Sequence, residues 1–216
     1  MLKSSLKINE IFYSIQGETT YVGIPTVFVR TTACNLRCTY CDTKYSYFEG
    51  ADQSLEDIIQ NIRVHKTKYV CITGGEPLLQ KPVYTLMETL CDQGYLVSLE
   101  TSGSKSIAAV DPRVKVILDV KTPDSGAANS FLLSNLDFAT PTTEFKFVIC
   151  SEKDFEWAEE FCRQHDLFEK YVVLYSPSYG KIAECWLAEN ILLENSSARL
   201  QLQLHKYIWS PEKRGV

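Results

Sequence analysis

Three of the chain's eight cysteines, Cys34, Cys38 and Cys41, fall within one eight-residue segment. Disulfides are rare in reducing compartments, so a cluster this tight favours metal binding over cross-linking. Three thiolates can ligate three irons of a [4Fe–4S] cubane and leave the fourth iron open to another ligand. The spacing therefore predicts a metal centre held by a short loop.

Zinc is the main competing metal. A structural zinc site usually has four ligands, often in paired knuckles. The first histidine after Cys41 is His65, and the chain has no second close pair of cysteines. A zinc-binding interaction module therefore stays open as an alternative that needs a distant fourth ligand. The five remaining cysteines are scattered among apolar neighbours, where we expect small buried side chains: Cys71, Cys91, Cys150, Cys162 and Cys185.

The apolar pattern predicts alternating strands and helices. Runs rich in β-branched and aromatic residues indicate strands at residues 6–12, 26–32, 69–73, 95–100, 114–120, 144–150 and 171–175. Helices are expected from the N-cap Ser54 toward His65, and over residues 82–92, 152–165 and 182–194, with loops at 43–54 and 122–130. This order is typical of βαβ units and a mostly parallel sheet.

The predicted fold is a single α/β domain over residues 1–216. Its 45% hydrophobic content suffices for one sizeable core. The helices are too few for a complete eightfold barrel, so we expect a partial, open TIM-like barrel. In parallel α/β folds, active sites gather at the carboxyl ends of the strands. The cysteine segment directly follows the strand predicted at residues 26–32, which places it at such an end.

Three further strand ends carry polar or glycine-rich motifs. The glycines of the first motif would let the backbone approach a ligand closely. In chain order the motifs are Thr73-Gly74-Gly75-Glu76-Pro77, Glu100-Thr101-Ser102-Gly103 and Asp119-Val120-Lys121. The Glu100 motif is weak on its own because such turns are common, and Asp119-Val120-Lys121 on its own would be an ordinary solvated strand end. Their order along the chain, after the cysteine segment and each at the end of a predicted strand, gives them weight.

The C-x3-C-x2-C spacing, with Tyr40 just before the last cysteine, resembles the signature of the radical S-adenosylmethionine (SAM) superfamily. The resemblance implies one [4Fe–4S] cluster on Cys34, Cys38 and Cys41. The cluster would reduce SAM to methionine and a 5′-deoxyadenosyl radical, which abstracts hydrogen from a substrate. It also implies SAM contacts at Tyr40, Gly75, Glu76, Ser102, Asp119, Val120 and Lys121.

The flanking segments are similar to one family within that superfamily. Residues 11–18, 23–30, 42–43 and 204–207 resemble the 7-carboxy-7-deazaguanine synthases. This implies conversion of 6-carboxy-5,6,7,8-tetrahydropterin to 7-carboxy-7-deazaguanine with loss of ammonia, in queuosine and 7-deazapurine (preQ0) biosynthesis. It also implies a homodimer and an external electron donor such as flavodoxin or ferredoxin.

The same resemblance implies roles for single residues. Thr43 would be a ligand of Mg²⁺, and Arg30 would face the substrate carboxylate, which a guanidinium can grip bidentately. The other expected substrate contacts are Ile15, Gln16, Gly17 and Thr73.

Three features near the expected site are left outside it. His205 and Lys206 match the family but fit a sheet-edge pair equally well. Residues 209–216 extend beyond the shorter family members, so no C-terminal substrate contact is expected here. Lys146 alternates with apolar residues and is not assigned to the site.

Composition disfavours several classes of function, and one other enzyme family remains as an alternative. A net charge of −5 disfavours nucleic acid as a partner, and no run of eighteen apolar residues predicts a membrane span. Residues 1–6 show no signal peptide, so a cytoplasmic protein is expected. The rival enzyme is a glycyl-radical enzyme activase, which shares the cluster and SAM motifs. Residues 15–18 and Arg30 argue against it.

Overall fold

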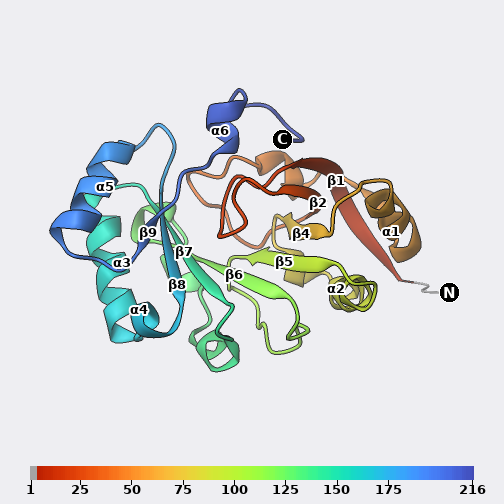
Figure 1. Cartoon of the computed structure of the whole chain (residues 1–216), viewed down its shortest axis with the longest axis horizontal. Coiled ribbons are helices and arrows are strands. Elements are labelled where there is room, and N and C mark those ends of the chain that lie inside the picture. The colour runs from red at the N-terminus through yellow and green to blue at the C-terminus, as the bar shows by residue number, and fades with distance from the viewer. Residues whose placement is uncertain (1–3) are drawn as a thin grey trace.

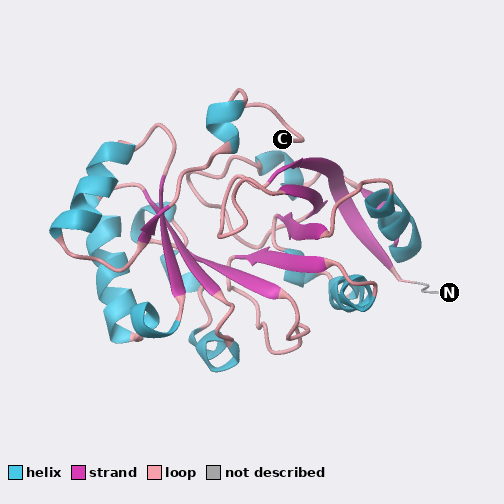
Figure 2. Ribbon diagram, in the orientation of Figure 1, coloured by secondary structure: helices cyan, strands magenta, loops and turns pink. Residues whose placement is uncertain are grey.

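The computed structural model describes residues 4–216 and contains one nine-stranded sheet, with the order β3-β1-β2-β4-β5-β6-β7-β8-β9 (Figures 1 and 2). The strands are β1 Ser5–Ile15, β2 Pro25–Thr31, β3 Ala51–Ser54, β4 Tyr69–Gly74, β5 Leu96–Thr101, β6 Lys115–Val120, β7 Glu144–Ile149, β8 Val172–Pro177 and β9 Arg199–Leu200. The α-helices are α1 Leu55–Arg63, α2 Pro82–Asp92, α3 Glu152–Gln164, α4 Leu167–Lys170, α5 Glu184–Leu193 and α6 His205–Ile208. Short 3-10 helices cover Lys44–Tyr47, Pro77–Leu79, Pro123–Ser125, Ala128–Ser130 and Leu133–Phe138.

The sheet is parallel from β2 through β4 to β9, and β1 and β3 add an antiparallel edge. Figure 1 shows the strands fanned into an open curve, with α1 and α2 outside one half and α3 and α5 outside the other. The short helix α6 and the C-terminus lie across the concave side. The predicted α/β fold with a mostly parallel, open sheet is confirmed.

Local sequence explains the helices and the two faces of the sheet. The Ser54 hydroxyl accepts a hydrogen bond from the Asp57 amide at 3.1 Å and caps α1, as predicted. Helix α2 has the predicted bounds. On β7, Phe147 packs against Trp157 of α3, whereas Lys146 lines the concave side. Because side chains alternate along a strand, β7 presents an apolar face to the helices and a polar face to the interior.

A β-bulge in β1 turns its side chains from one face to the other. Ile8 pairs with Thr31 of β2, but Glu10 already pairs with Arg30, so one extra residue lies between them. Leu6 and Ile8 therefore point into the apolar core, whereas Glu10 lies opposite Arg30 on the concave side. The hydrophobic pattern of residues 6–12 predicted the strand but not this switch of face.

Several sequence expectations are corrected by the structure. The predicted loop at 43–54 contains a 3-10 helix and ends in β3, a polar edge strand. His205 and Lys206 do not form a sheet-edge pair, because they begin helix α6.

None of the helices described for residues 4–216 combines the length and apolar character that a membrane span needs. Residues 1–3, part of the segment expected to lack a signal peptide, lie outside the described residues.

Candidate active site

A cavity of about 310 Å³ opens at the carboxyl ends of the parallel strands. It is lined by Cys34, Cys38, Cys41 and Thr43, by the expected substrate contacts Ile15, Gln16, Gly17, Arg30 and Thr73, and by the expected SAM contacts Tyr40, Gly75, Ser102, Asp119 and Lys121. The remaining two expected SAM contacts, Glu76 and Val120, are fully buried and do not line it. The structure thus brings nearly all the residues singled out from the sequence to one place.

The cysteine loop is braced by its own residues. Arg37 donates to the carbonyl oxygens of Cys34 at 2.8 Å and Leu36 at 2.7 Å, and its guanidinium lies 4.3 Å from the Tyr47 ring centroid. The Cys34 sulfur accepts from the Leu36 amide at 3.3 Å. Burial raises the pKa of the Cys34 and Cys38 thiols. Iron ligation would reverse this effect, because a metal-bound thiol is deprotonated.

The donor set of this loop fits a cubane cluster. Among residues 4–216, no three His, Cys, Asp or Glu side chains converge as the ligands of a single ion would. The three thiols nevertheless line one cavity, and a cubane distributes them over different irons. Beside them, the Tyr40 hydroxyl is buried with no hydrogen-bond partner in the described part of the chain. The loop therefore offers both sulfur ligands and a polar group for a neighbouring ligand.

The glycine motif after β4 is fitted tightly against this loop. The Gly75 amide donates to the Thr31 carbonyl at 3.2 Å, and the Glu76 amide donates to the Ala33 carbonyl at 2.8 Å. A Cβ atom at Gly75 would lie 2.1 Å from the Ala33 carbonyl oxygen. Only glycine permits this approach, which sets the start of the cysteine loop against the end of β4.

Glu76 connects the glycine motif to the end of β5. Its Oε1 accepts from the Leu78 amide at 3.1 Å and the Thr101 hydroxyl at 2.8 Å. Its Oε2 accepts from the Ser102 amide at 2.9 Å and the Ser102 hydroxyl at 2.6 Å. All four bonds occupy the carboxylate, so the side chain braces the strand ends rather than facing the cavity.

The expected substrate side of the cavity contains a partly buried guanidinium and a partly buried carboxyl. Arg30 pairs with Glu10 through its Nε at 2.7 Å. Burial disfavours the charged form of Arg30, but the Tyr45 and Glu10 side chains stabilise that form more strongly. The pKa of Arg30 is therefore raised. Beside Arg30, on the neighbouring strand β4, the Thr73 hydroxyl donates to Glu100 at 3.1 Å. Burial and the nearby Glu18 carboxylate raise the pKa of Glu100.

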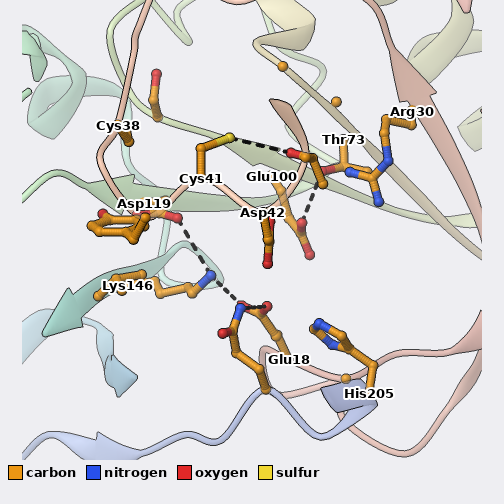
Figure 3. Close-up of a pocket in the computed structure, with 18 of the residues that line it drawn as sticks. Glu18, Arg30, Cys38, Cys41, Asp42, Thr73, Glu100, Asp119, Lys146 and His205 are labelled. Atoms are coloured by element: carbon orange, nitrogen blue, oxygen red, sulfur yellow. Dashed lines mark hydrogen bonds and ion pairs between the residues drawn. The ribbon is translucent and has the colours of Figure 1, made fainter. Parts of the chain in front are cut away.

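Charged residues that sequence reasoning did not assign complete the cavity wall. Figure 3 shows Lys146 extending between Glu18 and Asp119. Its ammonium forms an ion pair with Glu18 and lies 3.5 Å from Asp119 Oδ2, while Lys121 pairs with Asp119 Oδ1 at 2.9 Å. Burial alone would raise the pKa of Glu18, but Lys146 and His205 lower it to about 2. Glu18 is therefore a carboxylate at neutral pH.

The C-terminal segment reaches the cavity mouth. Lys206 pairs with Asp42, the residue after Cys41, at 2.8 Å. Arg214 pairs with Glu49 at 2.9 Å, and Val216 lines the cavity. The extension beyond residue 208 thus returns to the site, although its length suggested that it would not. These contacts join residues that are far apart in the sequence, so the sequence alone did not predict them. The match of residues 204–207 to the family was the one feature that pointed to this segment.

Comparison with known proteins places this site in a family. Residues 28–163 match the Radical SAM superfamily. The chain is 40% identical to 7-carboxy-7-deazaguanine synthase of Chlorobaculum tepidum, over 99% of each chain. It is 44% identical to that of Koribacter versatilis, over 98% of this chain and 100% of the relative. The crystal structure of QueE from Escherichia coli superimposes with a TM-score of 0.79 at 25% identity, covering 93% of this chain and 95% of that one.

The fold, the cysteine loop and the superfamily match together define a radical SAM enzyme, with the [4Fe–4S] cluster and SAM that this superfamily uses. Within that class, the chain belongs to the 7-carboxy-7-deazaguanine synthase family. This assignment separates it from the glycyl-radical enzyme activases and from zinc-binding interaction modules.

Proposed function

We propose that the chain converts 6-carboxy-5,6,7,8-tetrahydropterin to 7-carboxy-7-deazaguanine with loss of ammonia, as a lyase of queuosine and preQ0 biosynthesis. The observation that carries this proposal is family membership over almost the whole chain. The cavity supports it, because the cysteine loop and the expected substrate contacts line one volume. Residues around one volume can hold a cofactor and a substrate side by side.

Each cofactor has proposed partners. Cys34, Cys38 and Cys41 hold the cluster. Contacts to SAM come from Tyr40, Gly75, Ser102, Asp119 and Lys121, with Glu76 and Val120 acting through the backbone or through their neighbours. When bound, the cluster and SAM supply the one-electron chemistry that removes a hydrogen atom from the substrate. The chain's own part is to orient both ligands and to exclude water.

The substrate carboxylate has a proposed partner in Arg30. The Glu10 contact occupies Nε and leaves the terminal guanidinium nitrogens for a bidentate grip. Thr43, two residues past Cys41, is the proposed protein ligand of Mg²⁺. Mg²⁺ prefers hard oxygen ligands and often takes them from substrate and water, so one protein hydroxyl is enough. Ile15, Gln16, Gly17 and Thr73 complete the proposed substrate contacts.

The wider setting of the enzyme is also proposed. An external donor such as flavodoxin or ferredoxin supplies the electron, and the chain works as a cytoplasmic homodimer. Residues 1–216 form a single radical SAM domain, which the one continuous sheet supports.

An anaerobic assay tests the proposal. The protein, reconstituted with iron and sulfide and reduced with dithionite, is incubated with SAM and the carboxy-tetrahydropterin, with and without Mg²⁺. Formation of 7-carboxy-7-deazaguanine, faster with Mg²⁺, is the expected result. Absence of this product, or a glycyl radical formed instead on an added protein substrate, would refute the proposed activity. If the rate of product formation is the same with and without Mg²⁺, the proposed role of the metal is refuted and the proposed activity stands.

A further inference from the structure

The β1–β2 connection, residues 16–24, enters the concave side of the sheet and carries the proposed substrate contacts Gln16 and Gly17. No strand of the described chain pairs with this connection. Two buried ion pairs hold it from the sheet side. The upper pair, nearer the carboxyl ends of the strands, joins Glu18 to Lys146. The lower pair joins Lys115 to Glu144, whose carboxylate also accepts a hydrogen bond from the Thr20 amide at 3.2 Å.

The upper ion pair faces two proposed ligand sites at once. Lys146 of β7 lies directly beside Asp119 of β6 in the parallel register. Its side chain is only 10% exposed, and its ammonium contacts Glu18 on one side and Asp119 on the other. Asp119 belongs to the proposed SAM segment, and Glu18 follows the proposed substrate contacts. One buried cation thus connects the two segments.

The contacts of Glu18 are directional. Gln203 donates to Glu18 Oε1 at 3.0 Å, and Lys146 binds Oε2. The adjacent Gly17 carbonyl accepts from the Leu204 amide at 3.0 Å. The C-terminal segment and Lys146 thus hold the Glu18 carboxylate from two sides. Without the ammonium, the mostly buried carboxylate of Glu18 would lose its lysine partner, whereas Asp119 would keep Lys121.

We propose that Lys146 is a positioning residue that holds the substrate-lining segment at Gln16–Glu18 in register with the SAM-lining end of β6. This inference rests on the proposed function, because it concerns the relative placement of those two ligands. Hydrogen transfer depends steeply on that placement, since small displacements of bound reactants cost large factors in rate. Lys146 acts through Glu18 and Asp119 rather than through a contact of its own with either ligand.

The lower ion pair provides a matched control. Lys115 of β6 pairs with Glu144 of β7 at 2.6 Å and donates to the Thr20 hydroxyl at 2.6 Å. It is a buried Lys–Glu pair that holds the same connection, yet neither Lys115 nor Glu144 lines the cavity. Lys115→Met therefore reports the cost of losing such a pair at a position outside the cavity.

The test compares the reconstituted holoenzymes Lys146→Met, Lys146→Arg and Lys115→Met with the unsubstituted enzyme. The readouts are KM for the pterin, kcat, and 5′-deoxyadenosine released per molecule of 7-carboxy-7-deazaguanine. For Lys146→Met we expect a KM raised at least about tenfold and a ratio raised several-fold, because cofactor cleavage becomes uncoupled from substrate. Lys146→Arg should recover part of the coupling. Lys115→Met should unfold at lower temperature with the ratio unchanged.

Glu18→Gln keeps the inference falsifiable if Lys146→Met fails to fold, since it removes the partner charge and retains the lysine. It should raise the same ratio. An unchanged ratio in Glu18→Gln or Lys146→Met would overturn the inference, and so would an equal rise in Lys115→Met. If the unsubstituted enzyme makes no deazaguanine, the proposed function fails and the inference fails with it. If that enzyme makes product and the variants stay coupled, only the inference fails.

Discussion

Replacing Glu76 by glutamine tests whether this residue braces the strand ends rather than facing a ligand. Both carboxylate oxygens accept two bonds each, and the side chain has no exposed surface. The amide of glutamine can serve one pair of donors with its oxygen, but it turns N–H groups toward the other pair. The Thr101 or Ser102 hydroxyl can rotate to accept, whereas the backbone amide beside it cannot.

The magnitude follows from that orphaned amide. An unsatisfied buried donor costs about 1–3 kcal/mol, and the lost charge assistance of the remaining bonds adds roughly 1 kcal/mol. The total of about 2–4 kcal/mol should lower Tm by roughly 4–16 °C for a chain of this length. Thermal unfolding of the metal-free protein, followed by circular dichroism, measures it. Glu88→Gln, the same change at an exposed position of α2, should shift Tm by less than about 2 °C. A Glu76→Gln variant as stable as Glu88→Gln would refute the bracing role.

Three further substitutions probe the cavity. In Gly17→Ala the new Cβ would lie 2.4 Å from His205 Nδ1, so α6 should shift and kcat/KM for the pterin should fall about tenfold or more; an unchanged value would show that α6 yields freely. Arg30→Lys keeps the charge but loses the bidentate grip, so KM for the pterin should rise roughly 10–100-fold with the cluster content unchanged; wild-type KM would remove Arg30 from carboxylate binding. Thr43→Val should abolish stimulation by Mg²⁺ in steady-state assays; stimulation equal to wild type would place the metal elsewhere.

Much of the fold could be predicted because local patterns and tertiary structure agree. The β-branched runs were half-buried or fully buried strands, and Pro82 and Ser54 mark helix starts by their own chemistry. Strand β3 was missed because Ala51–Ser54 is a polar edge strand without an apolar pattern. The bulge before Glu10 was missed because nothing in the hydrophobic order of β1 requires it.

The site, like the fold, could be predicted only in part from the sequence. Cysteine spacing and strand-end glycines are local, so they predicted which residues gather at the cavity. The Glu18–Lys146 pair joins residues from distant parts of the chain, and it becomes visible only once β7 lies beside β6. Lys146 did carry one signal, since it is a charged residue between Phe145 and Phe147 in a buried strand. Such a residue needs a partner inside the protein, and the sequence does not say which.

The central claim is that this cavity performs radical-based ring contraction of a carboxylated pterin. The most direct measurement is the joint yield of 7-carboxy-7-deazaguanine and ammonia from the anaerobically reconstituted, dithionite-reduced enzyme supplied with SAM, Mg²⁺ and 6-carboxy-5,6,7,8-tetrahydropterin. The structure and the family predict the two products in equal amounts, and neither product from a Cys34→Ala variant. SAM cleavage by the unsubstituted enzyme with no deazaguanine formed would contradict the account.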